Sequence, residues 1–306
     1  MSKPKRHHWW PMTQSRYWTD TDGFVNVARA DGTAFRANPL NIGVESELYT
    51  RFGEDGDKDT AIEEWFAKVI DGPASKMIDH LLDPSNTYRY PFRGDPQKIQ
   101  TAKILGFRVN TYVDRVRIPP EIRQAIAGYI AALLVRHPKY LAKLKAFHRE
   151  NSDHSHEIKG LALDNMLNLY QVYTNQIAKA VFLISKRKGS SEYIYADGGI
   201  MVEEPWRTEY GIPFDIHAPL TPDIALQVLP IPSTNDLNTA AIMESTNQGT
   251  ARLNRIILGG AERFVFSRQA PPLKFIVQNF GKLAPKNIGY SLNNGQLETC
   301  YDPRRS

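Results

Sequence analysis

The sequence has a single cysteine and no long apolar run. Its 306 residues include one cysteine, Cys300, so no internal disulfide can form. This is typical of proteins from a reducing compartment. An apolar stretch such as residues 129–135 is far shorter than the roughly 20 residues of a membrane-spanning helix. No apolar signal segment follows the basic residues near the N-terminus. We therefore expect a cytoplasmic protein that does not enter a membrane.

Familiar catalytic signatures are absent as well. The sequence contains no GxxxxGK phosphate loop, no GxGxxG, no GxSxG, no HExxH and no CxxC. Each of these motifs carries a specific backbone geometry or ligand spacing that its chemistry requires. Their absence argues against NTPases, α/β-hydrolases and the common zinc proteases.

The excess of positive charge is confined to the two ends of the chain. The net charge is +5 and the pI is about 9.1. Lys3, Lys5 and Arg6 supply three of the surplus charges, and Arg304 and Arg305 exceed Asp302 by one. Because the body of the chain is almost neutral, the basic pI is weak evidence for nucleic-acid binding.

The residue patterns predict an α+β fold. Apolar residues before the Asp31-Gly32 turn indicate an N-terminal β-hairpin. Helical spacing within residues 59–70, 73–82, 120–135 and 157–179 predicts a central helical region, broken at Asp71-Gly72-Pro73. After residue 180 the period changes to two, which predicts a C-terminal mixed or antiparallel sheet with a helix at residues 236–259. We also expect a loop at residues 83–96 and a helix at residues 97–113.

The domain boundary is expected near residue 270. Residues 1–270 carry the periodic apolar pattern and are predicted to form a single α+β domain. Residues 271–306 contain several prolines and many Asn and Gly, so we expect an extended C-terminal tail.

His7 and His8 are the first candidates for catalysis. Adjacent residues of an extended segment point to opposite faces, so only one of them is expected to serve a given site. Histidine titrates near neutral pH and suits proton transfer or metal binding. The competing interpretation is a solvated basic arm that contains histidines by chance.

Carboxylates and one basic segment supply the other candidates. Asp197 follows a predicted strand and is either a functional carboxylate or a turn residue before Gly198. Glu45 and Glu63 could hold a divalent cation with a histidine and Asp197, although Glu63 also suits a helix N-terminus. A basic segment could bind backbone phosphates or form a solvated helix face; it contains Arg136, Lys139, Lys143 and Arg149.

The order of these motifs resembles the prokaryotic domain-of-unknown-function family numbered 4238. The family's HHYVP-type opening matches residues 7–11, and further matches lie at residues 41–45, 62–63, 196–197, 219–222 and 263–267. A helical asparagine corresponds to Asn247 or Asn254. The resemblance implies that one set of residues converges in space: His7, His8, Glu45, Glu63, Asp197 and Asn247.

Two functions from different classes are consistent with the sequence. The first is a hydrolase, most simply a nuclease that acts on RNA or DNA. His7 or His8, Asp197 and Asn247 would be catalytic, while Glu45, Glu63 and Asp197 would bind magnesium or manganese. The second is a non-catalytic interaction protein in which the His, Trp and Glu residues form a hydrogen-bonded cluster that fixes the N-terminal arm.

Overall fold

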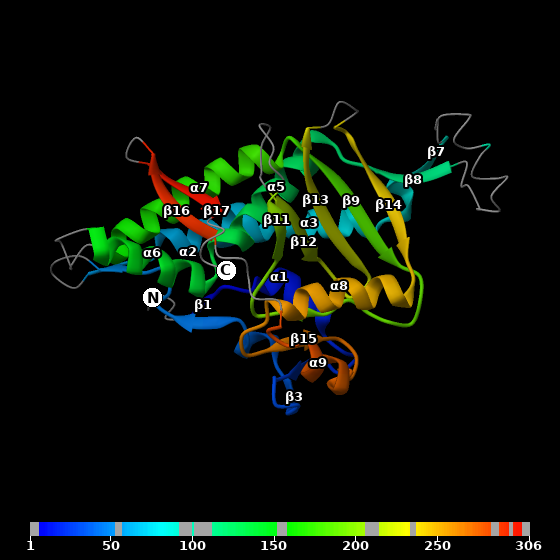
Figure 1. The fold of residues 1–306 in the computed structure, drawn as a ribbon, viewed down its shortest axis with the longest axis horizontal. Coiled ribbons are helices and arrows are strands. Elements are labelled where there is room, and N and C mark those ends of the chain that lie inside the picture. The colour runs from blue at the N-terminus through cyan, green and yellow to red at the C-terminus, as the bar shows by residue number, and fades with distance from the viewer. Residues whose placement is uncertain are drawn as a thin grey trace.

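The computed structural model describes residues 6–52, 57–91, 100, 112–151, 158–205, 214–232, 237–282, 288–293 and 296–301. It confirms the α+β class, with an N-terminal hairpin, a central group of helices and a mixed sheet followed by a helix (Figure 1). Most of the helix expected at residues 97–113 lies outside the described residues. Within them, no helix is long and apolar enough to cross a membrane.

A seven-stranded sheet forms the centre of the fold. Its order is β11-β12-β13-β9-β14-β8-β7, and every neighbouring pair is antiparallel except β9 and β14. In β9 the buried residues Ala180, Phe182 and Ile184 alternate with less buried ones, as expected for a strand with one face in the core. The strand bounds are β7 (Thr87–Pro91), β8 (Tyr112–Arg117), β9 (Ala180–Arg187), β11 (Met201–Pro205), β12 (Phe214–Pro219), β13 (Ile224–Pro232) and β14 (Thr239–Ser245).

Two sequence predictions were wrong in this sheet. Residues 87–91, expected in a loop, form strand β7 at the sheet edge. Residues 239–245, expected to be helical, form β14, and the helix α8 (Asn247–Gly259) begins only after it. β14 pairs with β8 on one side and β9 on the other, so tertiary pairing overrides the helical preference of Ala240 and Ala241.

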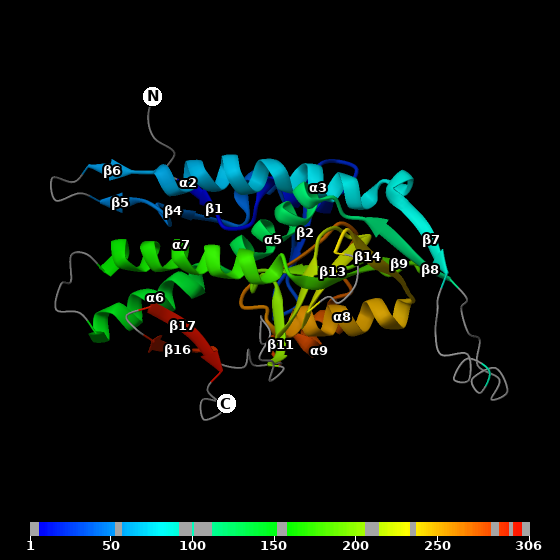
Figure 2. The ribbon, with the colours of Figure 1, turned by 90° about the horizontal axis from the view of Figure 1, so that it is seen from above.

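Helices pack around this sheet. Figure 2 shows α3 and α8 on opposite sides of it, and α5 beside α7. Helix α5 is buried almost all round, which explains its run of Ile, Ala and Leu residues. The bounds of the central helices are α5 (Pro120–Val135), α6 (Pro138–Asn151) and α7 (Ile158–Ile177).

The expected break at Asp71-Gly72-Pro73 is a π-helical turn inside one continuous helix. Helix α2 (Ala61–Trp65) leads into the π segment η3 (Phe66–Asp71) and then into α3 (Gly72–Leu82). The Gly72 N–H donates to the carbonyl oxygen of Ala67, a π-type hydrogen bond. Pro73 has no N–H, and its ring would meet the carbonyl four residues earlier in a regular helix. The wider turn accommodates this proline without ending the helix.

A second sheet joins the two ends of the sequence. Its order is β10-β15-β2-β3, so the N-terminal hairpin pairs with a strand from residues 265–267. The strand bounds are β2 (Val25–Ala28), β3 (Ala34–Ala37), β10 (Tyr195–Ala196) and β15 (Val265–Ser267). Separate short pairs are formed by β1 (Arg6–His8) with β4 (Val44–Ser46), by β5 (Arg51–Phe52) with β6 (Lys58–Asp59), and by β16 (Ile288–Asn293) with β17 (Gln296–Tyr301).

The aromatic N-terminal segment, residues 9–18, is anchored in the core. Trp10 and Trp18 are fully buried. The Trp10 ring stacks on Phe266 at 4.5 Å and on Tyr195 at 4.8 Å between centroids. Gln14, in the short helix α1 (Met12–Ser15), accepts from Trp10 Nε1 and donates to the Pro219 carbonyl oxygen at 2.8 Å. The segment therefore joins strands from the C-terminal half of the chain.

The predicted boundary at residue 270 does not mark the end of the core. Helix α9 (Leu273–Asn279) follows it, and Ile276 is fully buried against Ala28, Ile257 and Leu258. The Gly281 N–H donates to the Leu258 carbonyl oxygen at 2.9 Å. Residues 273–281 are thus packed, not extended as expected. The remaining elements are the 3-10 turns η1 (Arg16–Trp18), η2 (Pro39–Asn41) and η4 (Pro84–Asn86).

Candidate acid–base site at the N-terminal arm

The residues 6–10, here called the N-terminal arm, lie in an extended conformation across the molecule. The arm pairs with β4, and the N–H groups of Trp9 and Trp10 both donate to the Gly43 carbonyl oxygen, at 2.8 and 3.2 Å. Gly43 has φ of +64°, and a Cβ atom there would lie 2.5 Å from Trp10 Cβ. Only glycine allows this close approach, so Gly43 fixes the position of both histidines.

His7 has a structural role. Its side chain is fully buried, and Nδ1 accepts the Tyr49 N–H at 3.0 Å. The imidazole also stacks on the Tyr49 ring, with 5.8 Å between centroids. The hydrogen bond to Nδ1 requires this nitrogen to be unprotonated. His7 therefore holds the arm against residue 49, and it points away from the face that carries His8.

His8 is half-buried and lies beside two carboxylates and an arginine. Its backbone N–H donates to Glu63, and its carbonyl oxygen accepts from the Arg136 guanidinium. His8 Nδ1 and Glu63 Oε2 are both buried without a hydrogen-bond partner among the described atoms. Unpaired buried polar atoms are uncommon in proteins and often mark functional positions.

A buried ion pair between Arg136 and Asp71 lies beside His8 and Glu63. Arg136 is fully buried at the end of α5, and its guanidinium donates to Asp71 Oδ1 at 2.8 Å. The guanidinium also lies 4.7 Å from the centroid of Phe66, and the Tyr49 hydroxyl donates to the Arg136 carbonyl oxygen. Asp71 is the last residue of the π turn, so the irregular helix places it against Arg136. A buried arginine with these partners orients its neighbours.

The electrostatics push His8 and Glu63 towards their neutral forms. Burial raises the pKa of Glu63 to about 7, with Asp71 adding to the rise and Arg136 opposing it. Burial also lowers the pKa of His8, and Arg136 and Arg6 lower it further. At neutral pH the imidazole is therefore neutral, while the Glu63 carboxyl group is partly protonated. A neutral base beside a carboxyl group that titrates near pH 7 is the arrangement that general acid–base catalysis uses.

Asp197 does not join this group. Its carboxylate accepts three backbone N–H groups, from Glu262 at 2.8 Å, Arg263 at 2.8 Å and Phe264 at 3.0 Å. The following Gly198 passes so close to the Gly260 carbonyl oxygen that a Cβ atom would lie 1.9 Å from it. Asp197 thus fixes a loop in front of β15, as a turn residue. Burial raises its pKa, and the three N–H donors oppose that rise.

Glu45 and Asn247 are also placed apart from the His8 group. Glu45 faces His7 in the β1–β4 ladder, but its side chain is exposed. Asn247 is exposed at the start of α8, where its Oδ1 accepts the Ser191 N–H at 2.9 Å. Asn254, the other candidate, is buried and bonds the backbone of Glu192 and Ile194. In the part of the chain that the structure describes, no three His, Cys, Asp or Glu side chains gather as metal ligands.

Arg136 cannot belong to the predicted phosphate-binding face, because its side chain is buried in the core. Arg149 is exposed on α6, Lys143 on the same helix is half-buried, and the side chain of Lys139 lies outside what is described. Sequence reasoning therefore assigned Arg136 to the wrong environment. It also gave Asp71 no role, although the Asp71-Gly72-Pro73 irregularity was visible and marks the π turn.

Comparison with known proteins supports the resemblance in the sequence. Residues 6–271 match the model of a family described as "protein of unknown function (DUF4238)". No curated protein and no solved structure matches the chain. Since the match covers most of the sequence, the chain belongs to this family. The matched span begins at the arm and ends just before α9.

Proposed function

We propose that this protein is a hydrolase that cleaves phosphodiester bonds in single-stranded RNA, with His8 and Glu63 as its acid–base pair. The observation that supports it is that the His8 backbone N–H lies against the Glu63 carboxyl group, with His8 Nδ1 and Glu63 Oε2 both buried without a hydrogen-bond partner among the described atoms. The pKa of the histidine is lowered, and that of the glutamate is raised to about 7. His8 is on the arm and Glu63 is on helix α2, and each side chain is half-buried. Matched acid and base groups of this kind are typical of sites that move protons at neutral pH.

The chemistry follows from the protonation states. His8 takes the proton of a ribose 2′-hydroxyl, and the 2′-oxygen attacks the adjacent phosphorus. The bond from phosphorus to the 5′-oxygen breaks, and Glu63 gives its proton to that oxygen. The products are a 2′,3′-cyclic phosphate and a free 5′-hydroxyl, with His8 protonated and Glu63 ionised. Proton exchange with water restores both groups.

In this proposal Arg6 supplies the cation that contacts the phosphate. It lies two residues before His8 on the same strand, so both side chains leave the same face of β1. Arg6 is exposed, and its guanidinium donates to Asn41 Oδ1 at 3.3 Å and to the Leu40 carbonyl oxygen at 3.2 Å. These bonds direct the guanidinium along the arm. A cation at this place would stabilise the charge that develops on the phosphate oxygens.

The residues predicted as metal ligands do not come together. Glu45 is exposed, and the oxygens of Asp197 are occupied by backbone donors. The proposed reaction therefore uses the 2′-hydroxyl as an internal nucleophile and routes no step through a metal. The prediction of a magnesium or manganese requirement is tested alongside it.

The test is a cleavage assay on single-stranded RNA, with single-stranded DNA in parallel. We expect the parent protein to cleave RNA in chelator and to leave DNA intact. Glu63→Gln and His8→Gln should each lower the rate by about 100-fold or more. Glu64→Gln is the matched control, because Glu64 is exposed on the same helix. No RNA cleavage in chelator, magnesium or manganese, or unchanged activity of Glu63→Gln, would remove the proposal.

A structural role of the arm is the second candidate. It is favoured by the intramolecular bonds of His7, Arg136 and Asp197, all of which have partners inside the protein. On this interpretation Glu63 also serves only to hold the His8 N–H. The two candidates predict different stabilities for Glu63→Gln. If Glu63 is structural, the variant should be less stable than the parent protein, and if Glu63 is functional it should not be.

A further inference from the structure

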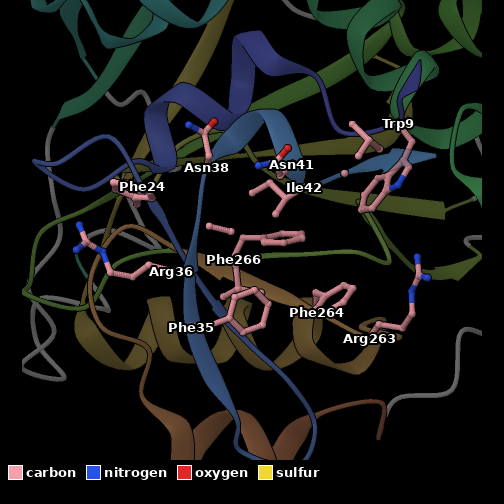
Figure 3. Close-up of a pocket in the computed structure, with 14 residues that line it drawn as sticks. Trp9, Phe24, Phe35, Arg36, Asn38, Asn41, Ile42, Arg263, Phe264 and Phe266 are labelled. Carbon is pink, nitrogen blue, oxygen red and sulfur yellow. The ribbon is translucent and has the colours of Figure 1, made fainter. Parts of the chain in front are cut away.

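A separate cavity lies beside Trp9 of the arm. Its volume is about 530 Å³, within the range of small-ligand sites. It is formed by the hairpin β2–β3, the segment 38–44, strand β15 and Trp9 of the arm (Figure 3). None of the residues described above as the acid–base pair lines it. Trp9 follows His8 directly, so one extended segment borders both the cavity and the acid–base site.

The walls of the cavity are aromatic. Phe35 and Phe264 meet edge to face with 6.5 Å between centroids, and Phe264 stacks on Phe266 at 6.4 Å. The Phe266 ring is itself fixed by Trp10, at 4.5 Å. Phe24 and Phe35 are each 38% exposed, a large exposure for phenylalanine side chains beside a cavity. Aromatic rings that are fixed by their neighbours and partly exposed offer a surface on which a planar group can stack.

Arginine side chains lie at the edge of the cavity. Arg36 and Arg263 line it, and Figure 3 shows them at opposite ends. The Arg29 guanidinium lies 5.3 Å from the Phe35 centroid and 5.4 Å from the Phe264 centroid. No acidic residue is among the described lining residues. An aromatic cavity with this rim favours a planar ligand that carries negative charge.

Of the two lining arginines, Arg263 is the better placed to bind an anion. The Arg36 guanidinium is paired with Asp20 and Asp22, at 2.6 Å each. The Arg263 side chain is 66% exposed, and its nearest carboxylate, Asp197, lies at 3.8 Å. That carboxylate already accepts three backbone N–H groups. Arg263 therefore keeps donors for a phosphate, next to the Phe264 ring 5.7 Å away.

One polar side chain of the cavity wall is held in place by a backbone hydrogen bond. Asn38 lines the cavity, and its Oδ1 accepts the Leu40 N–H at 2.9 Å as the cap of η2. This bond fixes the amide and leaves its NH₂ group as a donor. A fixed amide donor beside aromatic rings is a common element of base recognition.

We propose that this cavity binds one nucleotide, with the base against Phe35 and Phe264 and the phosphate at Arg263. The inference rests on the proposed function only in naming where a substrate nucleotide would be held, because its own evidence is the cavity. The same chemistry is presented by a free nucleotide and by one nucleotide of a single strand. Both sources are therefore compared in the test.

The experiment is calorimetric titration of the full chain carrying Glu63→Gln, which prevents turnover. The ligands are AMP, adenosine and a short adenosine oligoribonucleotide. We expect saturable binding of AMP and a loss of about tenfold or more for adenosine, which lacks the phosphate. If the natural source is a strand, the oligonucleotide binds much more tightly than AMP and with a steep salt dependence. If it is a free nucleotide, the two bind alike.

Variants locate the site. Phe35→Ala should weaken AMP binding by about fivefold or more, because one stacking partner is lost. Arg263→Gln should weaken AMP but not adenosine. Arg252→Gln, an exposed arginine on α8 away from the cavity, is the control and should bind as the parent does. The proposal is wrong if no ligand gives saturable heat, or if Phe35→Ala and Arg263→Gln both bind like the control.

The outcomes separate this inference from the proposed function. RNA cleavage by the parent protein without AMP binding in the cavity would reject the cavity and keep the acid–base site. AMP binding that depends on Phe35 and Arg263, with no RNA cleavage, would keep the cavity and reject the catalytic proposal.

Discussion

Glu63 carries its carboxyl group in surroundings that favour the neutral form. One oxygen is held by the His8 N–H, the other is buried without a partner, and Asp71 adds like charge. Arg136 offsets this only in part, because its guanidinium is bonded to Asp71 and the His8 carbonyl oxygen. The result is a group that exchanges a proton close to neutral pH, at a cost in stability to the folded protein.

This cost predicts how stability depends on pH. The pKa of Glu63 is about 7 in the folded protein and near 4.5 when unfolded, so between these values the folded state holds more protons. Through this group the free energy of unfolding should therefore fall as the pH rises from 4.5 to 7, by about 2–3 kcal/mol in total. Glu63→Gln should remove this dependence and be more stable than the parent above pH 7. Urea denaturation at a series of pH values measures both effects.

Glu64, the exposed neighbour of Glu63, provides the control for the urea denaturation series. Glu64→Gln should follow the parent at every pH, since the Gln side chain can still accept from the Thr60 hydroxyl. A Glu63→Gln variant whose stability falls with the same slope as the parent would show that this carboxyl group does not titrate as described.

At the scale of elements, the arm is held by backbone contacts that sequence patterns do not display. Gly43 supplies one carbonyl oxygen to two consecutive N–H groups, and its positive φ lets the chain turn beneath Trp10. The π turn η3 is the second irregular position, because it places Asp71 within hydrogen-bond distance of Arg136. Two irregular backbone positions therefore set the geometry around His8.

Gly43→Ala is expected to loosen the arm. The alanine would be strained at positive φ, at a cost of about 1–2 kcal/mol, and its Cβ would also meet Trp10 Cβ. Gly23→Ala is the matched control, since Gly23 has φ of +82° and no atom within 4 Å of the added Cβ. We expect Gly43→Ala to melt below Gly23→Ala and to be cut by protease in the arm. Equal melting temperatures would show that the close contact with Trp10 is unimportant.

At the scale of the whole molecule, helix α9 belongs to the folded body. Ile276→Ala should destabilise the protein by about 2–5 kcal/mol, because a fully buried side chain is removed from the cluster with Ala28 and Ile257. Val277→Ala is the control, since Val277 is the next residue and is 43% exposed. Thermal melts of the two variants decide the point. If both melt like the parent, the segment after residue 270 is a tail, as the sequence predicted.

Local patterns predicted much of this fold. The Asp31-Gly32 turn, the apolar faces of α5 and α7 and the alternation in β9 are properties of short segments, and each prediction was confirmed. β14 and β7 were missed because their pairing partners decide their structure. Helix α9 was missed because a single buried isoleucine gives no periodic signal in so short a helix.

The site was predictable only in part. The backbone N–H of His8 lies against the Glu63 carboxyl group, and the convergence of the two side chains at one site stays a prediction. Asp197 and Asn247 do not join them, and Arg136 is buried instead of exposed. Sequence spacing cannot show whether a carboxylate will accept backbone N–H groups from a loop 65 residues later in the chain, as Asp197 does with Glu262. It also cannot show that an arginine at a helix end turns inward.

The stacking of Trp10 on Tyr195 and Phe266 has a consequence for synthesis. Residues 6–18 are synthesised well before Tyr195 and Phe266, against which Trp10 packs. Contacts so distant in sequence form late, after the intervening loop has closed. The arm can pair with β4 and Gly43 early, but the Trp10 side chain reaches its final packing only once strand β15 has been made.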